Sequence, residues 1–148
     1  MQLEAAAETY SSWFTDGADR LHEKQALSKW LTTRAVEFDE SAKRLTVGFV
    51  ATAEHTNFME RVHGGLVGSM LDEAASIAGV CMVGWKRFRG TVDGRVSFLK
   101  PVAPGHLVAK ATLLRETTRL LFVEAELFGP QGDLCAKGGS LIAIAPAD

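Results

Sequence analysis

Three side chains that can do chemistry lie close together in residues 55–79, a stretch otherwise composed like a protein core. Asn57 is followed six residues later by His63, and Asp72 lies nine residues after that histidine. An amide, an imidazole and a carboxylate can each hydrogen-bond a ligand. Asn57 and His63 can equally serve only to hold local turns. The segment is therefore a candidate site. Whether its side chains bind a ligand or only hold local turns depends on the elements that position them.

Two glycines, Gly64 and Gly65, follow the histidine and stand where an apolar periodic run begins. The run predicts a helix, whose first backbone N–H groups have no intrahelical partner and whose N-terminus carries positive partial charge. Such a terminus can receive a developing oxyanion, and glycine permits close approach of the ligand. A glycine-rich helix entry with no further role explains the pair equally well.

The predicted helix has two different faces over residues 66–80. On one half lie the residues expected to pack on a sheet: Leu66, Val67, Met70, Leu71, Ala74, Ile77 and Ala78. On the other half lie Ser69, Asp72, Glu73 and Ser76.

Small residues surround Asp72 on that second half, namely Gly68 and Ser69 before it and Ala75, Ser76 and Gly79 after it. A glycine inside a helix costs about 1 kcal/mol relative to alanine. The stripe therefore predicts that a partner helix or an extended ligand comes close to this surface.

Strand patterns flank the helix on both sides. Residues 34–39 and 44–52 read as a hairpin around a polar turn, and residues 3–30 before them read as helix broken near Gly17. Four more strands are expected after the helix, in 91–99, 106–116, 118–129 and 134–145. Without another helix among them, these four are expected to form an antiparallel meander covered on one face by the long helix.

The first of these four strands alternates strictly. Val92, Gly94, Val96 and Phe98 are expected on one face, and Thr91, Asp93, Arg95 and Ser97 on a solvent-facing one. The prolines in Lys100–Gly105 are expected to mark the turn that follows, because proline donates no ladder hydrogen bond.

Composition narrows the classes of function. The 148 residues fit one domain, and 16 basic against 18 acidic side chains give a net charge of −2 without a basic stripe. We therefore expect no nucleic-acid or membrane partner, and no run is expected to reach the length of a membrane span. The N-terminus does not resemble a signal peptide, and Cys81 and Cys135 lack a CxxC spacing, so both are expected to be core thiols of a cytoplasmic protein.

The chain offers no metal or serine-hydrolase pattern. His22, His55, His63 and His106 are scattered without ligand spacing, so no metal and no cofactor are predicted. No G-x-S-x-G sequence occurs either, which disfavours a Ser-His-Asp hydrolase.

The Asn57, His63-Gly64-Gly65 and Asp72 pattern, followed by "GTVDGRVSFLKPV" and "TRLLFVEAEL", resembles the hotdog-fold thioesterases of the phenylacetate-pathway type. The resemblance covers about residues 33–146. It implies an α+β hotdog domain over 33–148, an antiparallel sheet wrapped around one long helix, with residues 1–32 as a helical extension. It also implies homodimers with sheets joined edge to edge, paired into dimers of dimers, and active sites at the dimer interface.

The same resemblance assigns the catalytic roles. Asp72 is implied as general base or nucleophile, and the backbone N–H of Gly64, with Gly65, as the group that polarises the carbonyl oxygen. Asn57 is implied to hold water or the thioester and His63 to orient the site. Thr91 is implied near the water. Because a thiolate leaves readily, this hydrolysis requires no metal.

The predicted substrate is an acyl-CoA or aryl-CoA, although the acyl group is not determined by one sequence. Candidate pocket residues are Phe58, Met59, Val62, Met82 and Trp85, and candidate contacts to the CoA nucleotide are Lys86, Arg87, Arg89 and Arg119. The basic cluster among them can also be a solvated turn. Two alternatives stay open, a hotdog dehydratase or hydratase and a non-catalytic acyl-CoA-binding module.

Overall fold

The structure is a computed structural model that describes residues 25–148 of the chain. The helices expected before residue 25 lie outside the described residues, and so does most of the extension predicted over 1–32. The described elements are α3 (Ala26–Trp30), β1 (Arg34–Asp39), β2 (Arg44–Ala51), the 3-10 helix η1 (Ala53–His55), α4 (Gly64–Val83), β3 (Phe88–Phe98), β4 (Gly105–Glu116), β5 (Leu120–Phe128) and β6 (Leu134–Ile144).

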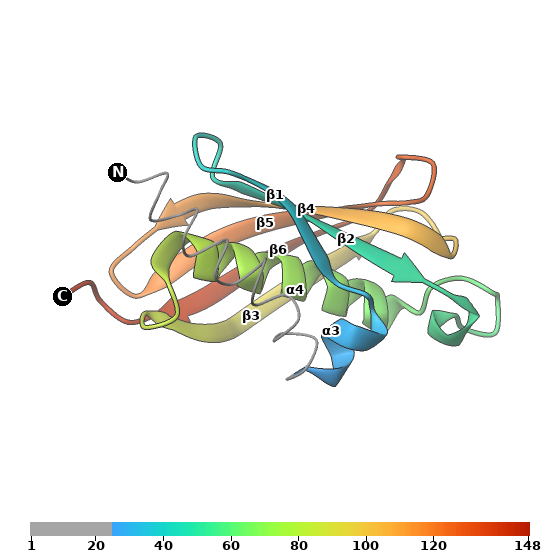
Figure 1. The fold of residues 1–148 in the computed structure, drawn as a ribbon, viewed down its shortest axis with the longest axis horizontal. Helices are drawn as coiled ribbons and strands as arrows, with labels where there is room; N and C mark the ends of the chain where they lie inside the picture. The colour runs from blue at the N-terminus through green and yellow to red at the C-terminus, as the bar shows by residue number, and fades with distance from the viewer. Residues whose placement is uncertain (1–24) are drawn as a thin grey trace.

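The six strands form one antiparallel sheet in the order β1-β2-β4-β5-β6-β3. The helix α4 runs along one face of this sheet and contacts five of its strands, β2 to β6 (Figure 1). The hairpin of β1 and β2 forms as predicted, around the polar turn from Glu40 to Lys43. The α+β hotdog arrangement is therefore confirmed.

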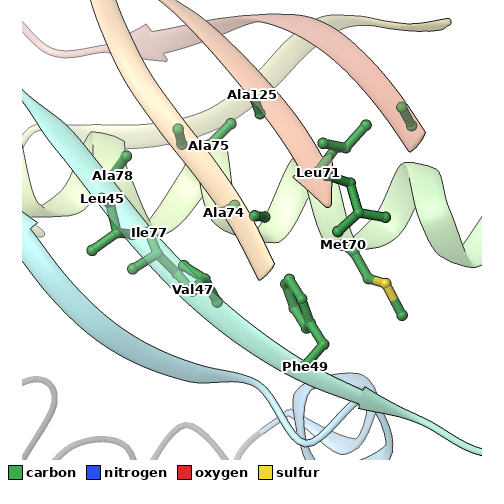
Figure 2. Packing of buried hydrophobic residues seen from close by; sticks show 14 of the residues in the cluster. Leu45, Val47, Phe49, Met70, Leu71, Ala74, Ala75, Ile77, Ala78 and Ala125 are labelled. Carbon is green, nitrogen blue, oxygen red and sulfur yellow. The ribbon is translucent and has the colours of Figure 1, made fainter. Parts of the chain in front are cut away.

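The core lies between α4 and the sheet (Figure 2). On β2, Leu45, Val47 and Phe49 are buried while the residues between them are partly exposed, as the alternation of a half-buried strand requires. Small side chains sit at the centre of the contact, and these include Ala74, Ala75, Ala78, Ala109, Ala111 and Ala125, all at most 2% exposed. Short side chains let the helix axis approach the curved sheet closely at native packing density.

The division of α4 into a packed face and a polar face is confirmed. Val67, Met70, Leu71, Ala74 and Ile77 are buried, whereas Asp72 is exposed. At 20 residues and a mean hydropathy of 1.5, this helix passes the length and composition test for a membrane span, so the expectation that no run reaches that length was wrong. Half of it is buried inside the domain, and the core of a water-soluble domain requires the same apolar composition.

The meander prediction was wrong for β3. This strand pairs with β6 at the edge of the sheet, while β4 pairs with β2 and β5. A short turn after α4 sends β3 back along the helix, where the Phe88 ring packs beside Gly79. The segment from Leu99 to Pro104 then crosses to β4, and two prolines suit this extended crossing better than a tight hairpin turn.

Strict alternation along β3 also fails, because the register shifts between Thr91 and Asp93. The shift leaves Val92 as an extra residue, so the strand changes parity there. Thr91 therefore faces α4 and donates a hydrogen bond to Asp72. Val96, beyond the shift, also faces α4: its side chain lies 3.7 Å from the point where a Cβ on Gly68 would be. The prediction that Thr91 and Val96 lie on opposite faces of the strand was wrong, although Thr91 is exposed, as predicted.

Packing against the domain's own sheet explains part of the stripe of small residues beside Asp72. A Cβ on Gly79 would lie 3.3 Å from Ile142 and 3.4 Å from both Leu121 and Phe88, so the domain's own sheet requires this glycine. Ala75 is fully buried as well. Only the part of the stripe near Gly68, Ser69 and Ser76 faces the outside of the core, which limits where a ligand or partner can approach.

Candidate active site

The N-terminus of α4 is capped by His63, whose Nδ1 accepts a hydrogen bond from the Gly65 N–H at 3.0 Å. The His63 carbonyl accepts the N–H groups of Leu66 and Val67. Within residues 25–148 the Gly64 N–H has no partner. Of the two glycine amides predicted to polarise a carbonyl, one is thus occupied by the cap, and Gly64 supplies the free donor.

The glycine pair has a steric cause that the sequence alone did not reveal. A Cβ on Gly65 would lie 3.1 Å from His63 Nδ1, and one on Gly64 would lie 3.4 Å from the Phe98 ring. The missing side chains let the imidazole and the end of β3 approach the helix terminus.

Asn57 holds the loop before the helix. Its Oδ1 accepts the N–H groups of Met59 at 2.9 Å and Arg61 at 3.3 Å, and its own N–H donates to the Arg61 carbonyl at 2.8 Å. Two backbone donors engage the amide oxygen, whereas the Nδ2 group has no partner in the described part of the chain. Asn57 can therefore donate to a ligand but is not free to accept from one.

Asp72 lies on the exposed side of α4, and its Oδ1 accepts the hydroxyl hydrogen bond of Thr91 at 2.7 Å. The Ser76 hydroxyl lies 3.5 Å from the same threonine oxygen. The second carboxylate oxygen has no partner among residues 25–148. One oxygen thus orients the group and the other is open to water or substrate.

The neighbouring carboxylate, Glu73, is fully engaged. One of its oxygens accepts from the Ser28 hydroxyl and the other from the Thr33 hydroxyl. Of these two adjacent carboxylates, therefore, only Asp72 keeps an oxygen that can bind water or substrate.

Two cavities contain most of these groups, one at each end of the exposed helix face, and His63 lines neither of them. The first, about 600 Å³, is lined by Asn57, Val62, Gly64 and Phe98, with Arg61 and Lys100 among its other residues. The second, about 450 Å³, is lined by Asp72, Thr91 and Trp85, and its other residues include Leu27, Glu73, Ile77, Val80 and Phe88.

A single chain does not bring the predicted catalytic set together. Asp72 follows Gly64 by eight residues, which is about 12 Å along the helix axis at 1.5 Å per residue. Asn57, His63 and Gly64 form one half of a site, and Asp72 with Thr91 forms the other.

The predicted pocket residues fall in different environments. Val62 is buried in the first cavity, Trp85 lines the second edge-to-face with Phe88, and Met82 packs half-buried against the core. Met59 also lines the first cavity, although it is 62% exposed, whereas Phe58 is 94% exposed and lines neither cavity. Sequence reasoning missed Leu27, Phe88 and Phe98, whose apolar spacing on their elements was visible but gave no sign of a cavity.

The predicted nucleotide contacts are unequal too. Arg87 pairs with Glu116 at 3.2 Å and donates to the Ala145 carbonyl, so it fastens the C-terminal strand. Arg89 donates to the carbonyl of Lys86, which is itself exposed, and Arg119 is exposed at the β4–β5 turn. These four residues do not line either cavity.

The first cavity has a basic edge that the sequence did not single out. The side-chain hydrogen bond from Lys100, at 2.5 Å, holds the pKa of Asp133 below its usual value, and Asp133 in turn raises the pKa of Lys100. Arg61 lies on the same cavity and is exposed.

Known proteins share this fold. Residues 59–136 match the sequence model of the family described as the Thioesterase superfamily. The match spans more than half of the chain and includes the helix of Asp72 and the strand of Thr91. The chain belongs to the thioesterase superfamily, and it is a thioester hydrolase of the hotdog fold.

Individual relatives agree with this family. A Sulfurisphaera tokodaii protein, provisionally named an esterase, is 26% identical over 121 residues, which cover 82% of this chain and 88% of that protein. A solved structure of a phenylacetic acid degradation-related protein from Ralstonia eutropha JMP134, provisionally described as a thioesterase, has a TM-score of 0.74 at 26% identity, covering 85% of this chain and 98% of that one.

The E. coli PaaI protein from the phenylacetic acid degradation operon has the same fold, with a TM-score of 0.75 at 21% identity, covering 88% of this chain and 91% of that one. The resemblance to hotdog thioesterases of the phenylacetate-pathway type is confirmed.

Proposed function

We propose that this protein hydrolyses an acyl-CoA thioester to the free acid and CoA, with Asp72 as the catalytic carboxylate. The observation that carries the proposal is the pair of unequal acids on α4. Asp72 keeps one unpaired oxygen beside a cavity and is oriented by Thr91, whereas Glu73 has both oxygens engaged.

Asp72 acts in one of two ways that lead to the same products. As general base it takes a proton from water, whose oxygen adds to the thioester carbonyl carbon. As nucleophile its own oxygen adds to that carbon and forms an anhydride, which water then hydrolyses. In both routes the carbonyl oxygen gains negative charge, the C–S bond breaks, and CoA leaves as a thiolate that is then protonated.

The oxyanion donor is the Gly64 N–H of a second copy of the chain. β3 is an edge strand whose Val92 and Phe98 are each 61% exposed. Antiparallel pairing of two β3 strands about a two-fold axis at Arg95, with Val92 as the extra residue, sets Phe98 of one copy opposite Thr91 of the other. Because Phe98 adjoins Gly64 and Thr91 adjoins Asp72, this pairing joins the two half-sites.

Two sets of basic side chains are candidates for binding the phosphates of the CoA nucleotide. Lys86, Arg89 and Arg119 stay candidates, and Arg61 and Lys100 on the first cavity join them, since ammonium and guanidinium groups bind phosphate. Assembly of two dimers into a tetramer and a cytoplasmic location also belong to the proposal.

The test is free-thiol release from a panel of aromatic and straight-chain acyl-CoA thioesters, with wild type beside Asp72→Ala. We expect release by wild type and a loss of about 10²-fold or more in the variant, the range typical of a general base. An Asp72→Ala protein that is folded, dimeric and as active as wild type would refute the role of Asp72. Turnover in heavy-oxygen water separates the two routes, because only the nucleophilic route incorporates label into Asp72.

A further inference from the structure

Glu73 takes no part in the proposed chemistry, yet it holds two buried hydroxyls. Ser28 and Thr33 are 0% and 2% exposed, and each donates to one oxygen of this carboxylate. The Gln25 side-chain oxygen lies 2.9 Å from the Ser28 hydroxyl oxygen. Hydrogen bonds to an ionised acceptor are about twice as strong as neutral ones. Glu73 thus fastens residues 25–33, which include α3, to the middle of α4.

The end of α3 is fastened separately. His55 Nδ1 accepts the Thr52 N–H at 2.8 Å, so the ring proton is on Nε2, which lies 2.9 Å from the Trp30 carbonyl oxygen and donates to it. The Val50 N–H donates to the Leu31 carbonyl at 3.1 Å. With its end bound to β2 and η1, α3 depends on Glu73 for the position of its first residues.

Leu27 is the residue that this position controls. It precedes Ser28, is 39% exposed, and lines the same cavity as Asp72. The remaining apolar lining comes from α4, from the turn after it and from the start of β3, and it consists of Ile77, Val80, Trp85 and Phe88. An apolar acyl group whose carbonyl lies at Asp72 would fill this space beside Leu27.

We propose that Leu27 is a specificity-determining contact for the acyl group and that Glu73 is the positioning residue that holds it there. The inference rests on the proposed function, because it places the thioester carbonyl at Asp72. The acyl group recognised is apolar and long enough to pass Leu27, which an acetyl group is not. Glu73 also lines this cavity, but both of its oxygens are engaged by Ser28 and Thr33, so it acts by holding residues 25–33 in place.

The first test compares decanoyl-CoA with acetyl-CoA for Leu27→Ala. We expect kcat/KM for decanoyl-CoA to fall about tenfold or more, since a missing methylene in an apolar pocket changes discrimination by roughly 10- to 200-fold. The value for acetyl-CoA is expected to stay unchanged. The matched control is Leu114→Ala, a leucine that is 63% exposed on β4 and lines neither cavity. An equal effect on both thioesters, or none on either, would overturn the role of Leu27.

The second test separates positioning from mere stability. Glu73→Ala is expected to raise KM for decanoyl-CoA while kcat for acetyl-CoA is kept, because the catalytic Asp72 is untouched. Loss of folded protein would instead lower kcat for both substrates by the same factor. Glu73→Gln keeps a carbonyl acceptor for one hydroxyl and is expected to recover part of the decanoyl-CoA affinity. Unchanged KM in folded Glu73→Ala would overturn the positioning role.

Direct binding distinguishes failure of this inference from failure of the proposed function. A decanoyl thioether of CoA, which cannot be hydrolysed, is titrated calorimetrically into wild type, Leu27→Ala and Leu114→Ala. Suppose that wild type releases no thiol from any thioester but binds the thioether, and that Leu27→Ala alone weakens this binding about tenfold or more. The proposed function then fails, and the contact between Leu27 and the acyl group stands. If wild type does not bind the thioether, or binds it as tightly as Leu27→Ala does, the contact is overturned.

Discussion

Thr91 donates a hydrogen bond to Asp72 across 2.7 Å, from an edge strand to a helix residue nineteen positions earlier in the chain. The bond exists because the register of β3 shifts beside Thr91 and turns its side chain towards α4. A carboxylate on an exposed helix face otherwise rotates freely, so the strand fixes which oxygen of Asp72 is open to water.

Removing that hydroxyl should cost turnover without unfolding the protein. Thr91→Val keeps the shape and deletes the donor, and we expect kcat to fall about tenfold, since a hydrogen bond to a charged group contributes roughly 1.5–3 kcal/mol. Thr91→Ser keeps the hydroxyl and is the control. The test is steady-state kinetics of both variants on the thioester that wild type hydrolyses best. Equal kcat for Thr91→Val and Thr91→Ser would contradict the proposal that Thr91 orients Asp72.

The Gly64 amide can be deleted with little disturbance of the fold. His63 has φ −58° and ψ 134°, a conformation that suits the residue before a proline, and proline is favoured at the first helical position. Gly64→Pro is expected to reduce kcat about 10²–10³-fold, as loss of one oxyanion donor does elsewhere.

The control for this change is Gly64→Ala, which adds the same Cβ near Phe98 but keeps the N–H. If both variants lose turnover equally, the effect comes from crowding at the Phe98 ring and the amide is not the donor.

Mixed dimers test whether each site uses two copies of the chain. Asp72→Asn and Gly64→Pro proteins, each inactive alone by the reasoning above, are expected to regain thioesterase activity when unfolded together and refolded. A heterodimer then contains one site with an intact Asp72 and an intact Gly64 amide. Separately refolded proteins, combined only afterwards, are the control. Activity that stays at the level of the single variants would mean that both half-sites must come from one chain.

The cap at His63 should contribute stability as well as geometry. Its imidazole accepts the Gly65 N–H, and loss of an N-cap side chain typically costs about 1 kcal/mol. His63→Ala is therefore expected to lower the free energy of unfolding by about that amount. His63→Asn, a good N-cap residue, should restore most of it, as urea unfolding of the two variants will show. Equal stabilities would mean that the imidazole caps nothing in solution.

The protein's own thiols should stay silent in a thiol-release assay. Burial raises the pKa of the Cys81 thiol to about 12, and burial also raises the pKa of Cys135. The thiolate is the reactive form, so at pH 8 both groups are protonated in the folded state and ionise more readily when unfolding restores an ordinary pKa. We expect slow labelling by a disulfide reagent in buffer and fast labelling of both cysteines in denaturant. Fast labelling of the folded protein would contradict the burial of these thiols.

Local sequence determined the parts of this protein that depend on near neighbours. The period of the apolar residues predicted α4 and its packed face, the alternation on β2 predicted which residues are buried, and Gly64 marked the start of the helix. The resemblance carried by His63 and Asp72 led to the correct family. Each of these rests on interactions within a few residues, which repeat regularly along the chain.

Only the tertiary structure decided how distant segments meet. Strict alternation put Thr91 on the wrong face, because a single extra residue in β3 reverses the parity and leaves no periodic trace. Which strand β3 pairs with depends on where α4 ends relative to the sheet. Both oxygens of Glu73 are engaged by Ser28 and Thr33, which lie at least forty residues earlier in the chain. The choice of Asp72 over its neighbour as the free carboxylate therefore belongs to packing, because contacts between segments far apart in sequence determine which acid is already paired.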